Sequence, residues 1–481
     1  MRRFQLLVMS LCIGVGLARS QAQTSASPVD YAALYADTIE SIYRTGLATY
    51  ETHARLSELC RVAPHRLAGS AGATRAIEWA QAAMVAGGLD NVRLEPCAVT
   101  HWERGEAAEL RVAEPDAAAP GGATPERFRV LALGGSIATP AAGITAELVV
   151  VSSFEELRTL RERAHGKIVL FNKPMDRTIY DPFHAYGEAA KYRGSGAVEA
   201  SKAGAVAALV RSATTKLDDF PHTGATGYLD DVPMIPTAAV STLAAERLAT
   251  LAAAGKPVVL FFRQGGTRHP LANSFNVVGE LRGRERPDEV VLVGGHLDCW
   301  DVGHGAHDDG AGSCHALSAL CLLKKLGLRP RRTLRVVLFM NEENGLGGGR
   351  AYARDHAAEL DKHVFAIESD RGGFAPRGFT TDCNPEARAV LASLAALLAG
   401  YGTQGLFKGG GGADISPMQE SGVILAGFYP DPQRYFDGHH TEADTIDKVN
   451  ERELELGTCA IASLIYMVAD LEQPLRRNPT R

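Results

Sequence analysis

The second half of the chain alternates short apolar runs with amphipathic helical patterns, and this rhythm constrains the fold more than any other feature. From residue 270 onward the runs carry few polar side chains, as expected of strands that are covered on both faces. The runs are Val290 to Gly294, Leu334 to Met340, Val364 to Ser369 and Gly422 to Tyr429, and the helical patterns are Ser313 to Leu326 and Glu451 to Leu471. This alternation predicts an α/β fold with a central, mostly parallel sheet.

The chain before residue 270 shows two different sequence patterns. Residues 30–60 and 70–88 show helical periodicity, and Val92 to Val99 alternates in the manner of a strand. Residues 121–267 instead carry short apolar runs separated by turn-rich stretches, with two helical patterns among them. Because the first pattern resumes after residue 267, we expect a small α/β domain that is inserted into a larger one.

The N-terminus has the pattern of a cleaved signal peptide. Two arginines precede the apolar stretch Phe4 to Leu17, and small residues follow it at Ala18, Ser20 and Ala22. The apolar stretch is too short to span a bilayer comfortably, and no later stretch reaches about 18 uninterrupted apolar residues. We therefore expect an exported protein, secreted or periplasmic, with no membrane contact after cleavage.

Charge and cysteine content exclude further classes of protein. The formal net charge is −6 and there is no run of lysine or arginine, which argues against a nucleic-acid partner. The cysteines are scattered and include no C-x-x-C pair, so we expect neither a disulfide framework nor a cysteine metal site. The expected organisation is a signal peptide (residues 1–22), the larger domain in two segments (23–120 and 268–481) and the inserted domain (121–267).

Acidic and histidine side chains follow the predicted strands of the larger domain. They are His296 and Asp298 after the first run, Asp308 and Asp309 in the next loop, Glu342 and Glu343 after the second run, Asp370 at the end of the third, and His439 and His440 after the fourth. Each motif alone is common in turns and surface loops. In open α/β sheets, however, ligands bind beyond the carboxyl ends of the strands, so we expect these loops to converge on one site.

The residue types at this expected site favour a divalent metal ion. Imidazoles together with carboxylates suit a cation of borderline hardness, zinc first. The adjacent acids Asp308–Asp309 and Glu342–Glu343 bring like charges together, a conflict that two metal ions would remove while leaving one carboxylate as a base. No G-x-S-x-G elbow, H-E-x-x-H helix motif or P-loop is present, so the corresponding serine hydrolase, zinc protease and nucleotide-binding classes are not supported.

Taken together, these motifs resemble the co-catalytic zinc aminopeptidase and glutamate carboxypeptidase family. The matching strings are Gly-Gly-His296-Leu-Asp298, Asp308-Asp309-Gly310, Glu342-Glu343, Glu368-Ser-Asp370 and His440-Thr-Glu-Ala-Asp444-Thr, and the likeness covers nearly the whole mature chain. The resemblance implies a three-layer αβα zinc-exopeptidase domain with a central mixed sheet, interrupted by a protease-associated-type α/β domain. It also implies two Zn²⁺ per chain and a homodimer.

The resemblance implies a metal-binding role for five residues. His296 and Asp370 would bind one metal ion, His440 and Glu343 would bind the other, and Asp308 would bridge the two.

The resemblance also implies roles in catalysis for three further residues. Glu342 would be the general base that takes a proton from the attacking water, and Asp298 would orient His296 through its carboxylate. His439 is a candidate donor to the oxyanion. A cis peptide bond is expected between Asp308 and Asp309.

The expected function is therefore a dinuclear zinc exopeptidase that acts on short peptides, dipeptides first. Two other classes stay open: an aminopeptidase that acts on longer peptides, and a non-catalytic binding protein on the same scaffold. A single-zinc acyltransferase is a further alternative. The residues do not say which peptide terminus is recognised, although Arg371 and Lys408 are candidate cations for a substrate carboxylate.

Overall fold

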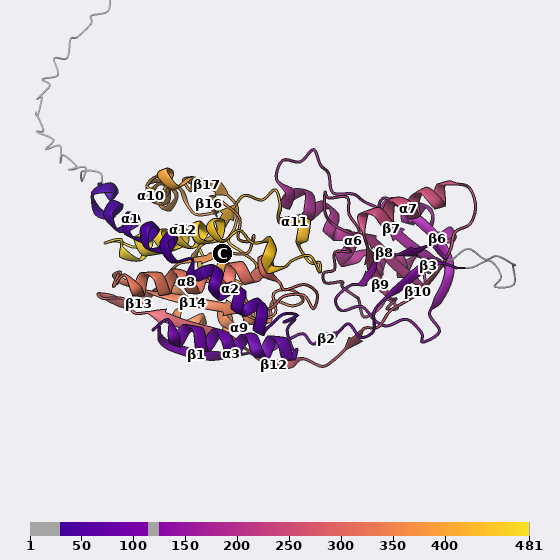
Figure 1. Cartoon of the computed structure of the whole chain (residues 1–481), viewed down its shortest axis with the longest axis horizontal. Coiled ribbons are helices and arrows are strands. Elements are labelled where there is room, and N and C mark those ends of the chain that lie inside the picture. The colour runs from indigo at the N-terminus through magenta and orange to yellow at the C-terminus, as the bar shows by residue number, and fades with distance from the viewer. Residues whose placement is uncertain (1–28, 114–124, 481) are drawn as a thin grey trace, which may run out of the picture.

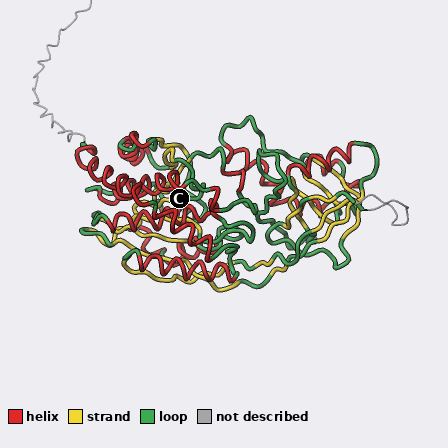
Figure 2. The backbone as a smooth tube through the Cα atoms, viewed as in Figure 1, coloured by secondary structure: helices red, strands yellow, loops and turns green. Residues whose placement is uncertain are grey.

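The computed structural model describes residues 29–113 and 125–480. The expected signal peptide (1–22) and the expected boundary between residues 120 and 121 lie outside the described residues. The chain forms two lobes, each built around its own eight-stranded sheet (Figure 1). Figure 2 shows that helices dominate the lobe that contains the C-terminus, whereas loops and strands dominate the other. Within the described ranges, no helix combines the length and the apolar character that crossing a membrane requires.

The first lobe contains a mixed sheet in the order β1-β12-β14-β13-β15-β18-β16-β17. Its strands are β1 (Asp90–Val99), β12 (Ala272–Leu281), β13 (Arg286–His296), β14 (Arg332–Phe339), β15 (His363–Glu368), β16 (Pro376–Thr381), β17 (Gly405–Lys408) and β18 (Ile424–Pro430). The four central strands run parallel, whereas β12 pairs antiparallel with β14, and β16 pairs antiparallel with β18. The prediction of a mixed α/β fold is confirmed.

Helices and turns cover both faces of this sheet, so β14, β15 and the second half of β13 are buried. The helices of the lobe are α1 (Tyr31–Thr49), α2 (Glu51–Val62), α3 (Ala71–Ala86), α8 (Ala311–Lys325), α9 (Gly347–Asp355), α10 (Pro385–Ala396), α11 (Tyr435–Gly438) and α12 (Glu451–Asp470). Along β13, Val291 and Val293 join the core under α8 and α12, while Leu292 packs on the opposite face with Tyr352 of α9. Alternate side chains of one strand thus enter two different cores.

The N-terminal helices differ from the sequence prediction in one detail. The predicted helical region 30–60 is two helices, because Tyr50 adopts a left-handed conformation (φ 47°) between α1 and α2. The helix predicted over 70–88 is α3, and the Ser70 side chain accepts a hydrogen bond from the Ala73 amide at its first turn, as is typical of an N-cap.

The second lobe contains a sheet in the order β4-β3-β10-β6-β7-β8-β9-β5. Its strands are β3 (Glu109–Val112), β4 (Arg127–Phe128), β5 (Val130–Ala132), β6 (Ile144–Val151), β7 (Ile168–Phe171), β8 (Ala207–Arg211), β9 (Thr237–Val240) and β10 (Val259–Arg263), and its helices are α4 (Phe154–Thr159), α5 (Arg161–Ala164), α6 (Pro182–Lys202) and α7 (Thr242–Ala253). Strand β3 precedes residue 121 and pairs with β10, so this sheet begins upstream of the boundary that the sequence suggested.

Two antiparallel chain segments connect the lobes. The chain leaves the first lobe through β2 (Trp102–Glu103) and returns through β11 (Thr267–Arg268), and these two strands pair with each other. Figure 1 shows β2 and helix α11 in the region between the lobes. The loops at the carboxyl ends of the central strands of the first lobe therefore lie next to the second lobe.

Candidate metal centre

The carboxyl ends of the four parallel strands bring the predicted side chains together. His296 is the last residue of β13, Glu343 follows β14, Asp370 follows β15, and His440 follows β18 and helix α11. Because the carboxyl ends of parallel strands meet at one edge of a sheet, these side chains converge with Asp308, which lies in the loop after β13. Three overlapping groups of residues at this edge, which also include Asp309 and His439, have ligand-type atoms within 4.8 Å of one another.

Asp308 occupies the centre of the cluster and offers one carboxylate oxygen to each side. Its Oδ1 lies 3.3 Å from Nε2 of His296, and its Oδ2 lies 3.2 Å from Nε2 of His440. Nε2 of His296 is also 3.4 Å from Oδ1 of Asp370, and Nε2 of His440 is 3.0 Å from Oε2 of Glu343. These contacts divide the five side chains into two groups that share Asp308.

Burial and neighbouring charges shift the pKa values of three acidic side chains at the cluster. Burial and the neighbouring Asp308 charge raise the pKa of Glu343 to about 7, and burial also raises the pKa of Glu342 well above its usual value. Burial opposes the charged form of Asp308 too, but the two flanking imidazoles hold its pKa well below the usual range. Oε1 of Glu343 is buried and accepts no hydrogen bond from the described residues. Imidazole nitrogens and carboxylate oxygens arranged in this way fit divalent cations.

Two further aspartates fix the backbone around the cluster. Asp309 accepts hydrogen bonds from the amides of His296 and Gly312, each at 3.0 Å, and so joins the end of β13 to the start of α8. Asp444 accepts hydrogen bonds from the amides of His307 (2.8 Å) and Asp308 (3.0 Å). The expected cis peptide bond between Asp308 and Asp309 is present.

The structure corrects the expected contact between Asp298 and His296. Nδ1 of His296 lies 3.0 Å from the backbone carbonyl oxygen of Asp298, whereas the Asp298 carboxylate is 3.8 Å away. Oδ1 of that carboxylate instead accepts hydrogen bonds from the amides of Asn341 (2.8 Å) and Glu342 (3.1 Å). Residues 297–300 follow β13 without regular secondary structure, and their path brings the carbonyl rather than the carboxylate of Asp298 to the imidazole. The Asp298 carboxylate therefore positions the Glu342 loop.

His439 is buried beside the second group of the cluster. Its ring stacks on that of His440 with 3.5 Å between centroids, and its Nε2 is 3.5 Å from Oδ2 of Asp308. The rings of Tyr186, Tyr435 and Phe436 surround it at 5.1 to 5.2 Å. Burial holds the pKa of His439 well below its usual value, so the ring is neutral and carries one N–H.

The second lobe contributes contacts that the sequence reasoning missed. The Thr223 carbonyl oxygen lies 3.2 Å from Nδ1 of His440, and the Thr223 amide donates a hydrogen bond to the His440 carbonyl at 2.9 Å. Arg193 approaches the same Nδ1 at 3.4 Å. His222 is buried nearby, and its burial together with the His440 charge lowers its pKa to about 3. No residue spacing signals such contacts, because they depend on how the two lobes pack.

The two candidate cations for substrate binding lie in different places. Arg371 is half-buried, and its guanidinium lies over the ring of Phe183 at 4.2 Å and over that of Tyr429 at 5.3 Å. Lys408 is exposed at the end of the edge strand β17. Arg371 thus faces the second lobe next to Asp370, whereas Lys408 belongs to the sheet edge.

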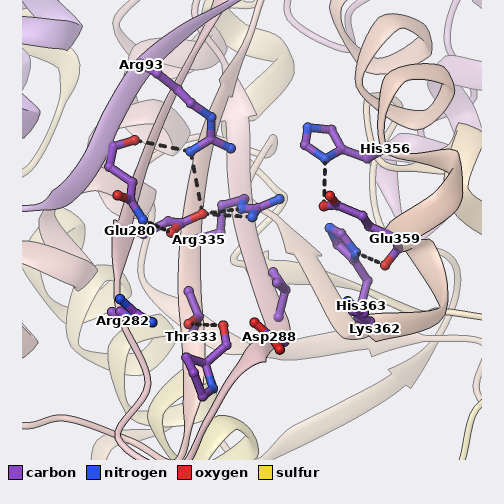
Figure 3. A pocket seen from close by; sticks show the side chains of 13 residues that line it. Arg93, Glu280, Arg282, Asp288, Thr333, Arg335, His356, Glu359, Lys362 and His363 are labelled. Atoms are coloured by element: carbon purple, nitrogen blue, oxygen red, sulfur yellow. Dashed lines mark hydrogen bonds and ion pairs between the residues drawn. The ribbon is translucent and has the colours of Figure 1, made fainter.

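A cavity of about 510 Å³ lies at the opposite end of the same sheet (Figure 3). Val290, Thr333 and His363, which line it, stand near the amino ends of β13, β14 and β15. Arg335 and Glu280 form an ion pair at 2.8 Å in its wall, and Figure 3 shows Arg93 joining this pair. The cavity is therefore separate from the cluster around Asp308, which lies at the carboxyl ends.

Comparison with known proteins gives consistent matches. Residues 276–465 match the model described as Peptidase family M28. Carboxypeptidase Q of Xenopus laevis is 40% identical over 90% of this chain and 88% of its own length, and carboxypeptidase Q of Homo sapiens is 38% identical over 90% and 88%.

Solved structures match as well. The peptidase M28 precursor from Shewanella amazonensis superposes with a TM-score of 0.88 at 33% identity and covers 93% of this chain and 100% of its own. The zinc aminopeptidase BSAP from Bacillus subtilis gives a TM-score of 0.63 at 20% identity, covering 88% and 98%, which is a likeness of fold.

Proposed function

Since the chain belongs to peptidase family M28 and is a metallo-exopeptidase, we propose that it is a dinuclear zinc enzyme that hydrolyses short peptides, dipeptides first. The observation that carries the proposal is the position of Asp308, whose two oxygens contact two separate groups of ligand-type side chains. A single-metal site would need only one such group.

The residues that would hold the two zinc ions are the five of the cluster. His296 and Asp370 would bind one ion, His440 and Glu343 the other, and Asp308 both. When bound, a pair of zinc ions supplies a polarised scissile carbonyl and a water of lowered pKa. The backbone oxygen of Asp298 and that of Thr223 hold the imidazoles of His296 and His440 in the orientation that turns Nε2 inward.

Glu342 is the proposed proton carrier. Its side chain is 23% exposed, more than those of Asp308 and Glu343, and its Oε2 lies 4.0 Å from Nε2 of His296. It can therefore reach a water at the open side of the cluster, accept its proton and return that proton to the leaving amine. The hydrogen bond from its amide to Asp298 keeps the loop in place.

His439 is the proposed donor to the oxyanion. Its neutral ring lines a cavity of about 210 Å³ beside the cluster, together with Lys216, Arg434 and Lys448. An N–H in that wall would stabilise negative charge on a substrate oxygen. The cavity is lined by these three cations and also by Asp437 and Asp444, so its charges are mixed. Recognition of a substrate C-terminus is therefore proposed from the name of the carboxypeptidase Q relatives.

A panel of dipeptides and tripeptides with free and blocked termini tests the proposal. The zinc-loaded protein should hydrolyse dipeptides with a free C-terminus, and C-terminal amidation should lower kcat/KM by about tenfold or more, the loss expected for about 1.4 kcal/mol of binding. A larger loss on N-acetylation than on amidation would instead support an aminopeptidase. No hydrolysis of any peptide would support a binding protein on this scaffold.

A further inference from the structure

Two histidines and a glutamate gather on one face of the ribbon that connects the lobes. In this ribbon Thr267 pairs with Glu103 and Arg268 with Trp102, so the next pair along the ladder is His269 with His101. The His269 amide donates a hydrogen bond to the His101 carbonyl at 3.0 Å, which continues the pairing. Residues two apart on one strand, and residues directly opposite each other, share one face of a ribbon. His101, Glu103 and His269 therefore point to the same side.

Their side chains converge closely enough to share one ion. Nε2 of His101 is 3.4 Å from one carboxylate oxygen of Glu103, and Nε2 of His269 is 3.4 Å from the other. All three ligand-type atoms lie within 4.8 Å of one another. Donors bound tetrahedrally at about 2.0–2.2 Å from zinc stand roughly 3.3–3.6 Å apart, which is the distance of each Nε2 from its nearest Glu103 oxygen.

The two imidazoles stack on each other, with 4.3 Å between their centroids. Both Nε2 atoms contact the same carboxylate, that of Glu103. Nε2 of His269 is shielded from solvent and has no hydrogen-bond partner among the described residues. The Glu103 side chain is 63% exposed, so water can reach the open side and fill the remaining coordination positions.

We propose that His101, Glu103 and His269 form a peripheral site for one divalent transition-metal ion of the zinc class. Neutral imidazole and carboxylate ligands are the donors that such ions prefer. The site is distinct from the cluster around Asp308, with which it shares no residue. Because His101 adjoins the outgoing strand and His269 the returning one, a bound ion ties together the two segments that connect the lobes.

Metal counting in paired variants tests the proposal. In the double variant H296A/D308A, which removes His296 and the shared ligand Asp308 from the central cluster, we measure bound zinc by mass spectrometry after zinc loading and dialysis against metal-free buffer. Adding H101A and H269A to that background should lower the count by one ion per chain, whereas adding H165A, at an exposed histidine outside the connecting ribbon, should leave it unchanged.

Removing both histidines from the otherwise native chain makes the test independent of the central cluster. H101A/H269A should bind one zinc ion fewer than the native protein, whatever number the central cluster holds, and its peptidase activity can be followed separately. This comparison also decides the matter if H296A/D308A does not fold. An unchanged zinc count in H101A/H269A, with circular dichroism showing a folded protein, would overturn the peripheral site.

Discussion

At the scale of single residues, each adjacent acidic pair divides two tasks between its members. Asp308 faces the two imidazoles, while Asp309 turns to the amides of His296 and Gly312. Glu343 lies against His440 and is almost fully buried, while Glu342 stays at the more open side. In each pair, one side chain contacts the histidines of the cluster. The second member holds the backbone in the case of Asp309 and is the proposed base in the case of Glu342.

Glu342→Gln tests the division of roles directly. Glutamine has nearly the same shape but cannot accept a proton, so the variant should retain metal and lose about 10²- to 10⁴-fold in turnover, the usual contribution of a general base. Steady-state kinetics and metal content should be measured on the same sample. His296→Ala and Asp308→Ala should behave differently, because each removes a ligand and should release metal.

The matched control is Glu420→Gln, at an exposed glutamate of the first lobe, which should keep native turnover. Near-native turnover in Glu342→Gln would rule out Glu342 as the base.

Much of the cluster can be predicted from the sequence, since its residue types follow strand ends in a recognisable order. His296, Asp308, Glu342, Glu343, Asp370, His439 and His440 do meet at one edge of the sheet. The roles of backbone atoms cannot be read in this way. Sequence reasoning assigned the His296 contact to the Asp298 carboxylate, whereas the carbonyl of the same residue makes it, because the path of the turn decides which atom is near.

At the scale of elements, the contact between α2 and α12 contains a buried acid that should make stability depend on pH. Glu455 of α12 is 2% exposed and accepts hydrogen bonds from the amide (3.1 Å) and hydroxyl (3.0 Å) of Thr52. Burial raises its pKa from 4.5 to about 7. The folded state therefore binds this proton more tightly than the unfolded state does, and stability falls as pH rises from about 4.5 to about 7.

Glu455→Gln should remove this pH-dependent cost. Glutamine can keep the contact with Thr52 and carries no charge, so the variant should be more stable than the native chain at pH 8, by on the order of 1–3 kcal/mol, and similar to it at pH 4 to 5. Calorimetric unfolding temperatures at the two pH values measure the effect, with the exposed Glu472→Gln as control. An equal drop in Tm between the two pH values in Glu455→Gln and in the native chain would contradict the assignment.

Elements with strong apolar periodicity are those that the sequence predicts well. The four central parallel strands and helices α3, α8 and α12 lie within a few residues of their predicted positions. Helix α6 was not predicted, because its buried face is made largely of alanine and glycine and its glycines weaken the helical signal. The sequence pattern assigns the residues of β3 to the larger domain, whereas the strand belongs to the sheet of the second lobe. Its partner is β10, about 150 residues later, and local patterns carry no trace of such a distant partner.

At the scale of the whole molecule, the second lobe completes the surroundings of the cluster. Thr223 holds His440 through two backbone contacts, and aromatic rings from both lobes pack around His439. Phe436 of α11 is 3% exposed and contacts the rings of Tyr186 (4.6 Å) and Phe183 (4.8 Å) from the second lobe. The relative position of the lobes is therefore part of the site.

Phe436→Ala should weaken this junction. Removing a buried phenylalanine costs about 3–5 kcal/mol, and here the loss lies next to His439, which stacks on His440. We expect a lower Tm together with at least about a tenfold loss in kcat/KM, the equivalent of 1.4 kcal/mol or more in the transition state. Phe407→Ala, at a ring on the sheet edge that packs on Tyr429, should leave kcat/KM unchanged.

A lower Tm with native kcat/KM in Phe436→Ala would show that the junction supports folding without supporting the site.

The most direct test of the account is an anomalous difference map, recorded at the zinc absorption edge from crystals of the zinc-loaded protein. We predict two strong peaks at the cluster about 3.5–4 Å apart, as in other two-metal sites, one beside His296 and Asp370 and the other beside His440 and Glu343, with Asp308 contacting both. A single peak at the cluster, or two peaks that Asp308 does not join, would contradict a dinuclear enzyme.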